Sequence, residues 1–218
     1  MENHLRFRLQ LSDPGDPQQW AMATRHVADM LHPMLSDRTV WKVQMDTYQR
    51  EIERYGAGGI LISEEAFSHD SLLLLSCLED PMFEEDQELR FFAAVKNMEQ
   101  WLSLFNLSLE ERADFCDDMA GAFALQFGPD VKRRLDLQYR DWKKPIAHFL
   151  SGSRFDPAFR EREKNLQDLG LPIKNISSYI HMSMNRWFAT EQRLMEYMSY
   201  HFCGKYYNQL IHHTNGSQ

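Results

Sequence analysis

The sequence predicts an α+β fold, in which a small antiparallel sheet near the N-terminus packs on a large, mostly helical body. Two observations support this prediction. Apolar and polar residues alternate in two short segments before residue 48, and apolar residues recur at helical spacing from residue 63 onward. Strands and helices that occupy separate parts of a chain are typical of α+β proteins.

Two strands are expected to form the sheet. The first covers residues 5–11, and the second covers residues 40–47, where Trp41, Val43 and Met45 alternate with polar residues. Between them, residues 12–15 form a turn sequence, and residues 17–34 are predicted to form an amphipathic helix that stops near Pro33. Because a sheet of two strands is only marginally stable, a further strand is expected to complete it.

The rest of the chain has a helical pattern. Residues 49–56 are predicted to form a turn or a short helix, and Ser108 followed by Glu111 indicates a capping box at a helix start. Longer helices are predicted over residues 63–78, 88–105, 109–127, 129–150, 157–168 and 173–207.

The composition limits the classes of function. The chain has 218 residues, 43% of them apolar and 26% charged, as is usual for one soluble globular domain. The net charge of −8 argues against binding to a phosphate backbone. No apolar run is long enough to span a membrane and the N-terminus has no signal-peptide pattern, so a cytoplasmic location is expected. The three cysteines have no metal-binding or disulfide spacing, and no metal site is expected.

Two candidate sites contain arginine. Arg6 and Arg8 would project from one face of the first strand, where two guanidinium groups suit a carboxylate or a developing oxyanion. Glu51 and Arg54 would pair on one face of a helical turn that follows Tyr48. Each has a simpler explanation, because a solvated strand face and a surface ion pair both contain such charges.

Two further candidates lie in predicted helices. His181 and Asn185 are four residues apart, so a histidine acid or base could have its ring fixed by a neighbouring amide. The simpler interpretation of His181 is a buried core histidine. The run His69-Asp70-Ser71 is unlike a hydrolase triad, because consecutive helical residues point in different directions.

Taken in order, four motifs resemble one family. They are His-Leu-Arg-Phe-Arg at residues 4–8, Tyr-Gln-Arg-Glu-Ile-Glu-Arg-Tyr-Gly at 48–56, Phe-x-x-Asp-Ser at 67–71 and Ile-His-Met-x-Met-Asn-Arg at 180–186. Together they resemble the C-terminal, glutamate-eliminating domain of class I lantibiotic dehydratases, also called the thiopeptide-type bacteriocin biosynthesis domain. The resemblance runs from residue 4 to about residue 205 and treats residues 1–218 as one such domain.

The resemblance implies a lyase that removes glutamate from glutamylated Ser or Thr of a ribosomally made precursor peptide, leaving dehydroalanine or dehydrobutyrine. It implies five catalytic residues and four substrate-binding residues. The catalytic set is Arg6, Arg8, Glu51, Arg54 and His181, and the substrate-binding set is Tyr48, Asp70, Asn185 and Arg186. No cofactor is implied, because glutamyl-tRNA would be used by a separate glutamylating component. The other expected partner is the precursor peptide, with no nucleic acid bound directly, and the sequence leaves room for a homodimer.

Two departures from the family pattern keep alternatives open. The histidine of the third motif is displaced by one position to His69, and the helix and strand that precede the first motif in family members are apparently missing. One alternative is an enzyme of the same fold that forms the pyridine ring of thiopeptides by cycloaddition. Another is a non-catalytic module that binds a precursor peptide.

Overall fold

The computed structural model describes residues 6–215, and this part of the chain is helical with no strand assigned. The predicted α+β class with an N-terminal sheet is therefore wrong. The first predicted strand begins at Leu5, which lies outside the described residues. The chain divides into two compact units between Arg50 and Glu51.

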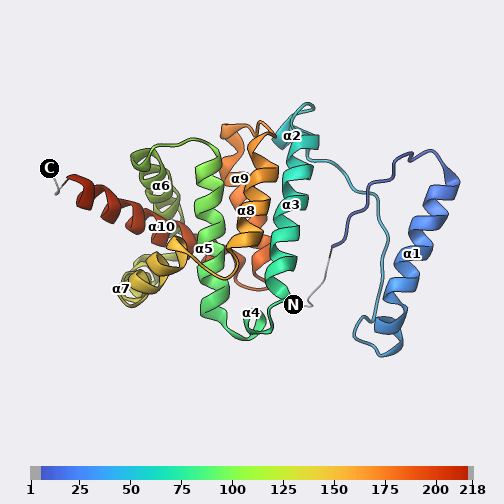
Figure 1. Cartoon of the computed structure of the whole chain (residues 1–218), viewed down its shortest axis with the longest axis horizontal. Coiled ribbons are helices and arrows are strands. Elements are labelled where there is room, and N and C mark those ends of the chain that lie inside the picture. Colours follow the sequence, from blue (N-terminus) through green and yellow to red (C-terminus); the bar gives the residue numbers. More distant parts are fainter. Residues whose placement is uncertain (1–5, 216–218) are drawn as a thin grey trace. The chain divides into compact units, whose positions relative to one another are not determined.

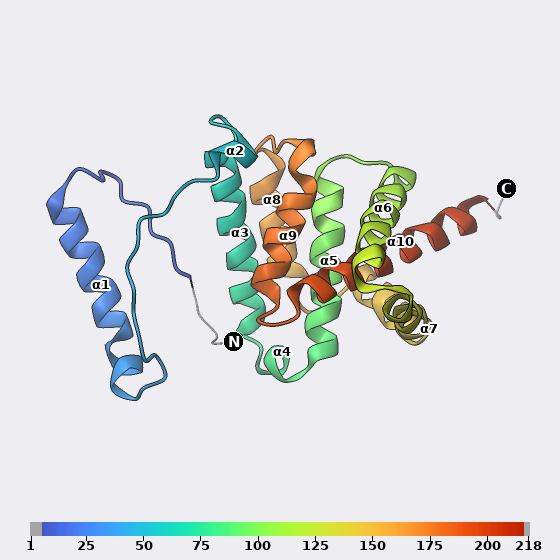
Figure 2. The ribbon, with the colours of Figure 1, turned by 180° about the vertical axis from the view of Figure 1, so that it is seen from behind.

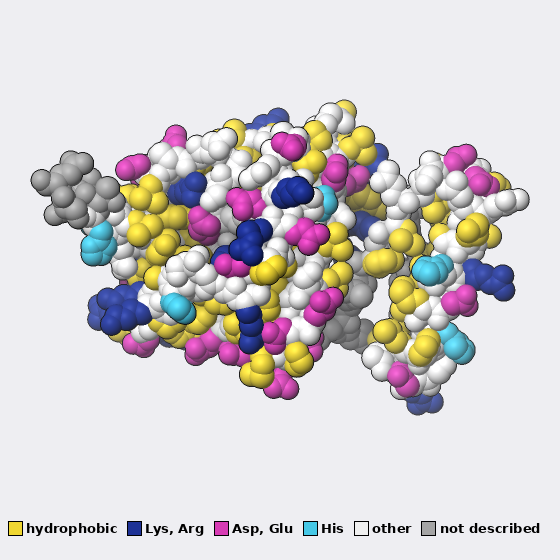
Figure 3. All heavy atoms as spheres, viewed as in Figure 1, with side chains coloured by type: hydrophobic (Ala, Val, Ile, Leu, Met, Phe, Trp, Pro, Cys, Tyr) yellow, Lys and Arg dark blue, Asp and Glu magenta, His cyan; other side chains and the backbone are white. Residues whose placement is uncertain are grey.

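The described residues of the two segments predicted as strands, 6–11 and 40–47, are irregular, although they alternate as expected. Most of their apolar side chains are exposed, among them Phe7 by 65%, Trp41 by 69% and Met45 by 64%. An alternating pattern predicts a strand only where one face is buried and the backbone is paired, and neither condition holds here. Figure 3 shows hydrophobic side chains, in yellow, on the surface of the first unit, which is drawn in blue in Figure 1.

The helix of the first unit, α1 (Pro17–Ser36), forms where it is predicted but does not stop at Pro33. Asp16 caps its start by accepting a hydrogen bond from the Gln18 backbone N–H at 2.8 Å. Pro33 lies inside the last turn, and none of the residues of α1 is buried.

The second unit contains the core and most of the predicted helices. Its helices are α2 (Ile52–Tyr55), α3 (Ile60–Leu78), α4 (Pro81–Glu85), α5 (Gln87–Leu104), α6 (Leu109–Phe127), α7 (Pro129–Ser151), α8 (Asp156–Gln167), α9 (Ile176–Trp187) and α10 (Gln192–Asn215). In both ribbon views α3, α8, α9 and α5 stand side by side, while α10 crosses beside α6 and α7 (Figures 1 and 2). The capping box at Ser108 and Glu111 is confirmed.

The long helix predicted over residues 173–207 is wrong, because the structure breaks it. A 3-10 turn covers Ile173–Asn175, α9 ends at Trp187, and α10 starts at Gln192. Phe188 is extended, with φ −126° and ψ 127°, and Glu191 adopts a left-handed φ of 54°. No glycine or proline marks this break, so the usual sequence signals for a helix end are missing.

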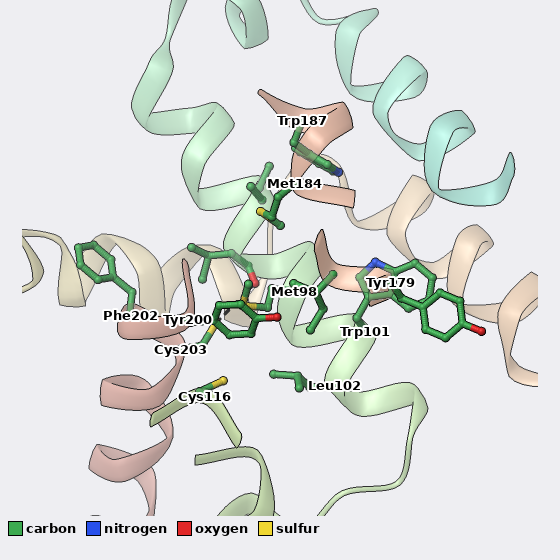
Figure 4. Packing of buried hydrophobic residues seen from close by; sticks show 14 of the residues in the cluster. Met98, Trp101, Leu102, Cys116, Tyr179, Met184, Trp187, Tyr200, Phe202 and Cys203 are labelled. Atoms are coloured by element: carbon green, nitrogen blue, oxygen red, sulfur yellow. Dashed lines mark hydrogen bonds between the residues drawn. The ribbon is translucent and has the colours of Figure 1, made fainter. Parts of the chain in front are cut away.

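The core of the second unit is built largely from aromatic rings. Trp101 of α5 stacks on Tyr179 of α9, with ring centroids 5.4 Å apart and an angle of 8° between the planes (Figure 4). Phe123 of α6 stacks in the same way on Tyr197 of α10, at 5.8 Å and 11°. Large buried aromatic surfaces of this kind contribute much of the hydrophobic stabilisation of a small domain.

Four methionines of α9 and α10 contribute to the core of the second unit. Met184 is 0% exposed and Met198 is 6% exposed, while Met182 and Met195 pack against the core from partly buried positions.

None of the helices in the described part of the chain is long and apolar enough to cross a membrane.

One polar cluster between α7 and α10 makes stability depend on pH. His201 Nε2 lies 2.9 Å from Asp136 Oδ1, and Lys205 Nζ lies 2.9 Å from the same oxygen. Burial lowers the pKa of His201, although the hydrogen bond to Asp136 opposes this shift. Between that lowered pKa and the ordinary value of about 6.5, only the unfolded chain binds the proton, so stability is lost as the pH falls through this window.

We therefore expect the urea concentration at the unfolding midpoint of the wild-type chain to decrease as the pH is lowered from 7.5 to 5.5. Each pH unit in which only unfolded His201 holds the proton removes up to about 1.4 kcal/mol. A His201→Gln variant should show a flatter dependence over this range. Equal slopes for the two proteins would contradict the assignment to His201.

Candidate functional site

Arg8 and Tyr48 come from two predicted clusters and meet in the first unit. The guanidinium carbon of Arg8 lies 4.2 Å from the centroid of the Tyr48 ring, a cation–π contact. Both side chains are exposed, and so is Arg6. The contact orients one guanidinium group but leaves its polar edge accessible to an anion.

The predicted pairing of Glu51 with Arg54 is present at the start of α2. Arg54 Nη1 lies 3.1 Å from Glu51 Oε2, and the two side chains are 47% and 41% exposed. An ion pair so exposed contributes little to stability. The backbone that carries the pair is nevertheless anchored to the core, because the residue after Arg54, Tyr55, is buried at 3% exposure.

An aromatic cluster links the second, third and fourth motifs. The rings of Tyr55 in α2, Phe67 in α3 and Tyr179 in α9 pack with centroid separations of 5.6 to 5.9 Å. Arg186 places its guanidinium carbon 4.7 Å from the centroid of Phe67. This packing holds the Glu51–Arg54 turn beside the helices that carry Asp70 and His181.

Asp70 lies at the centre of a buried polar network. Its side chain is 0% exposed, and its Oδ1 is 3.2 Å from Arg162 Nη2 and accepts hydrogen bonds from Asn97 at 3.2 Å and Ser183 at 3.1 Å. Arg186 Nη1 lies 3.7 Å from Asp70 Oδ2. The two predicted substrate-binding residues Asp70 and Arg186 are therefore paired, and the carboxylate fixes the position of the guanidinium group.

The buried partner of Asp70, Arg162, was not predicted from the sequence. Its side chain is 1% exposed, and its guanidinium carbon lies 4.2 Å from the centroid of the Trp101 ring. Burial lowers the pKa of Arg162 to about 10, while the charge of Asp70 opposes this shift. Arg162 lies in the strongly charged segment of α8, and only its spacing from Phe159 and Leu166, three and four residues away on the same helix face, indicates that it points inward.

His181 makes two ring contacts at the junction of α9 and α10. Its Nδ1 lies 2.8 Å from Glu196 Oε2, and its Nε2 lies 3.1 Å from Asn185 Nδ2. The His181 side chain is 32% exposed, whereas that of Glu196 is 2% exposed. His181 is therefore a partly exposed histidine held by a buried carboxylate, rather than a core histidine.

The sequence does not predict Glu196 as a partner of His181, because it predicts one continuous helix over residues 173–207. In one continuous helix, residues 181 and 196 would be about four turns apart and could not touch. The turn at 188–191 folds α10 back so that the carboxylate reaches the imidazole. Arg193, one turn before Glu196, also approaches the carboxylate, with its Nη1 3.3 Å from Oε2.

Eight of the nine predicted site residues thus form four local contacts, and the ninth, Arg6, is exposed. The contacts are Arg8 with Tyr48, Glu51 with Arg54, Asp70 with Arg186, and His181 with Asn185. In the part of the chain that the structure describes, no group of three or more His, Cys, Asp or Glu residues is arranged to hold a metal ion.

Comparison with known proteins identifies what the chain is similar to. The family model described as lantibiotic biosynthesis dehydratase C-term matches residues 1–207. The subtilin biosynthesis protein SpaB of Bacillus subtilis is 23% identical over 163 residues, which cover 67% of this chain and 16% of that protein. The chain thus matches only a small part of the length of this relative. No solved structure matches.

Proposed function

Because the chain belongs to the family of lantibiotic biosynthesis dehydratase C-terminal domains, we propose that it eliminates glutamate from glutamylated Ser or Thr residues of a precursor peptide. The products would be dehydroalanine from Ser and dehydrobutyrine from Thr. This chain would supply the elimination step of the dehydration. A partner enzyme would form the glutamyl ester from glutamyl-tRNA.

The reaction needs a proton acceptor and fixed positive charge. Removal of the Cα proton places negative charge on the adjoining peptide carbonyl, and departure of the ester group leaves a glutamate carboxylate. Preorganised cations lower the energy of both developing charges. Arg6, Arg8 and Arg54 are assigned to this role, since guanidinium groups bind carboxylates with two parallel hydrogen bonds.

The observation that carries the proposal is the setting of His181. It combines a partly exposed imidazole with a buried carboxylate at 2.8 Å, an arrangement that holds the ring of a histidine in place while it takes up and releases a proton. Glu51 is assigned to orient Arg54, and the exposed Asn185 lies close enough to Nε2 to contact a bound peptide.

The proposal is tested with a synthetic precursor peptide that carries a glutamyl ester on one Ser. The chemical ester removes any need for the glutamylating partner. The expected result with the purified protein is a peptide that has lost glutamate and contains dehydroalanine, measured by mass spectrometry. The same peptide without protein, and a peptide with unmodified Ser, serve as controls.

Two other results would overturn the proposal. Cyclisation of a peptide that contains two dehydroalanines, while the glutamyl ester stays intact, would identify the pyridine-forming relative. Binding of the peptide without any change in mass would identify a non-catalytic recognition module.

A further inference from the structure

The contacts of His181 go beyond naming it as a proton carrier, because they distinguish its two ring nitrogens. A carboxylate only accepts hydrogen bonds, so the nitrogen next to Glu196 must carry a proton. The amide nitrogen of Asn185 only donates, so the nitrogen next to it must present a lone pair. Both contacts are satisfied together by neutral imidazole with its proton on Nδ1.

Resting on the proposed function, we propose that Glu196 is a positioning residue that holds the proton of neutral His181 on Nδ1, so that Nε2 is the nitrogen that exchanges protons with the substrate. Which residue takes the Cα proton is open from the sequence. The geometry assigns this step to His181 through one particular atom.

The burial of Glu196 makes this orientation strong. With 2% of its side chain exposed, the carboxylate has little access to water and depends on protein donors. The nearby donors are His181 Nδ1 at 2.8 Å and Arg193 Nη1 at 3.3 Å. Arg193 is 52% exposed and lies over the Phe123 ring, so the histidine is the closer and more enclosed of the two partners.

Asn185 has a different part in this arrangement. Its side chain is exposed, so the amide can turn into solvent when a peptide approaches Nε2. After Nε2 has taken a proton, the amide oxygen can accept a hydrogen bond from the new N–H. Asn185 therefore contacts Nε2 of His181 in the free protein and can leave this nitrogen accessible to a bound peptide.

The step balances as a β-elimination. Nε2 takes the Cα proton, the electron pair of that C–H bond forms the Cα–Cβ double bond, and the Cβ–O bond breaks to release glutamate as a carboxylate. His181 becomes an imidazolium ion beside the Glu196 carboxylate. It returns to the neutral form by giving the Nε2 proton to water.

The first test measures the ring of His181 without any substrate. Ring nitrogen chemical shifts, recorded by two-dimensional ¹⁵N–¹H NMR at a pH where His181 is neutral, should show the proton on Nδ1. In Glu196→Gln and Glu196→Met variants the signal should move toward the Nε2–H form. A wild-type ring with its proton on Nε2, or no change in the variants, would overturn the proposal.

The second test measures elimination from the glutamyl-ester peptide. Loss of the correct tautomer costs about 10⁴-fold in Ser-His-Asp proteases, and loss of the outer partner of a metal-bound histidine costs about 10–10². We expect kcat of Glu196→Gln to fall about 10²-fold with little change in KM. Glu161→Gln is the matched control, because Glu161 is exposed on α8 and outside the site.

The two tests separate this inference from the proposed function. A wild-type protein that shows the Nδ1–H ring but never releases glutamate would refute the function and leave the positioning by Glu196 intact. A wild-type protein that releases glutamate at the same kcat as Glu196→Gln would refute the positioning and leave the function intact. Thermal unfolding of each variant is measured as a control, to distinguish a loss of signal from a loss of the fold.

Discussion

Replacing His181 with alanine is expected to lower the rate of glutamate loss from the glutamyl-ester peptide by about 10²–10⁴-fold, the usual contribution of a positioned acid or base. The peptide should still bind, because the exposed arginines Arg6 and Arg8 are unchanged. Because binding is kept and elimination is slowed, the ester should remain on the bound peptide. The measurement is the single-turnover rate of glutamate loss, followed by mass spectrometry.

The matched control for this variant is His148→Ala. His148 is exposed on α7 and makes no contact with the residues assigned to the site, so its removal should leave the rate unchanged. His181→Ala also leaves Glu196 with Arg193 alone, so its unfolding midpoint has to be compared with that of the wild type. A folded His181→Ala protein that eliminates glutamate at the wild-type rate would remove His181 from the mechanism.

Replacing Asp70 with asparagine is expected to have the largest effect on stability. The substitution keeps the shape of the side chain but removes the charge that faces Arg162, whose side chain is 1% exposed. Breaking a buried ion pair by removing one partner costs about 3–5 kcal/mol, because the other charge remains buried. The free energy of unfolding, measured by urea titration, should fall by this amount.

A second substitution tests whether the uncompensated charge is the cause. Asp70→Asn combined with Arg162→Met should recover part of the loss, since an apolar side chain needs no counter-charge. Asp118→Asn, at an exposed position of α6, should change stability by less than about 0.5 kcal/mol. If the double variant lost more unfolding free energy than the two single variants lose together, the buried-charge explanation would be wrong.

The burial of Asp70 also changes how its predicted role is understood. With 0% exposure it makes no contact with solvent, and it holds Arg186, whose side chain is 18% exposed. Any effect of Asp70 on a peptide would therefore pass through Arg186. Its place in the Phe-x-x-Asp-Ser motif is explained by this network as well as by substrate binding.

The amino-acid sequence by itself determined most of the helices of the second unit, the capping box at Ser108 and the family. Helical periodicity and capping are local properties, so a short stretch of sequence contains the information that specifies them. The order of the four motifs along the chain was likewise sufficient to identify the family that matches residues 1–207. The ion pair of Glu51 and Arg54 followed from their separation of three residues.

Tertiary structure decided the rest. Alternation at residues 5–11 and 40–47 predicted strands, but a strand needs a paired backbone and a buried face, and the alternating residues do not supply these by themselves. The partners Arg162 and Glu196 are set by contacts between residues 92 and 15 positions apart, which no local pattern encodes. The turn at 188–191 brings Glu196 to His181, and because it contains neither glycine nor proline, only the packing of α10 against α6 and α9 reveals it.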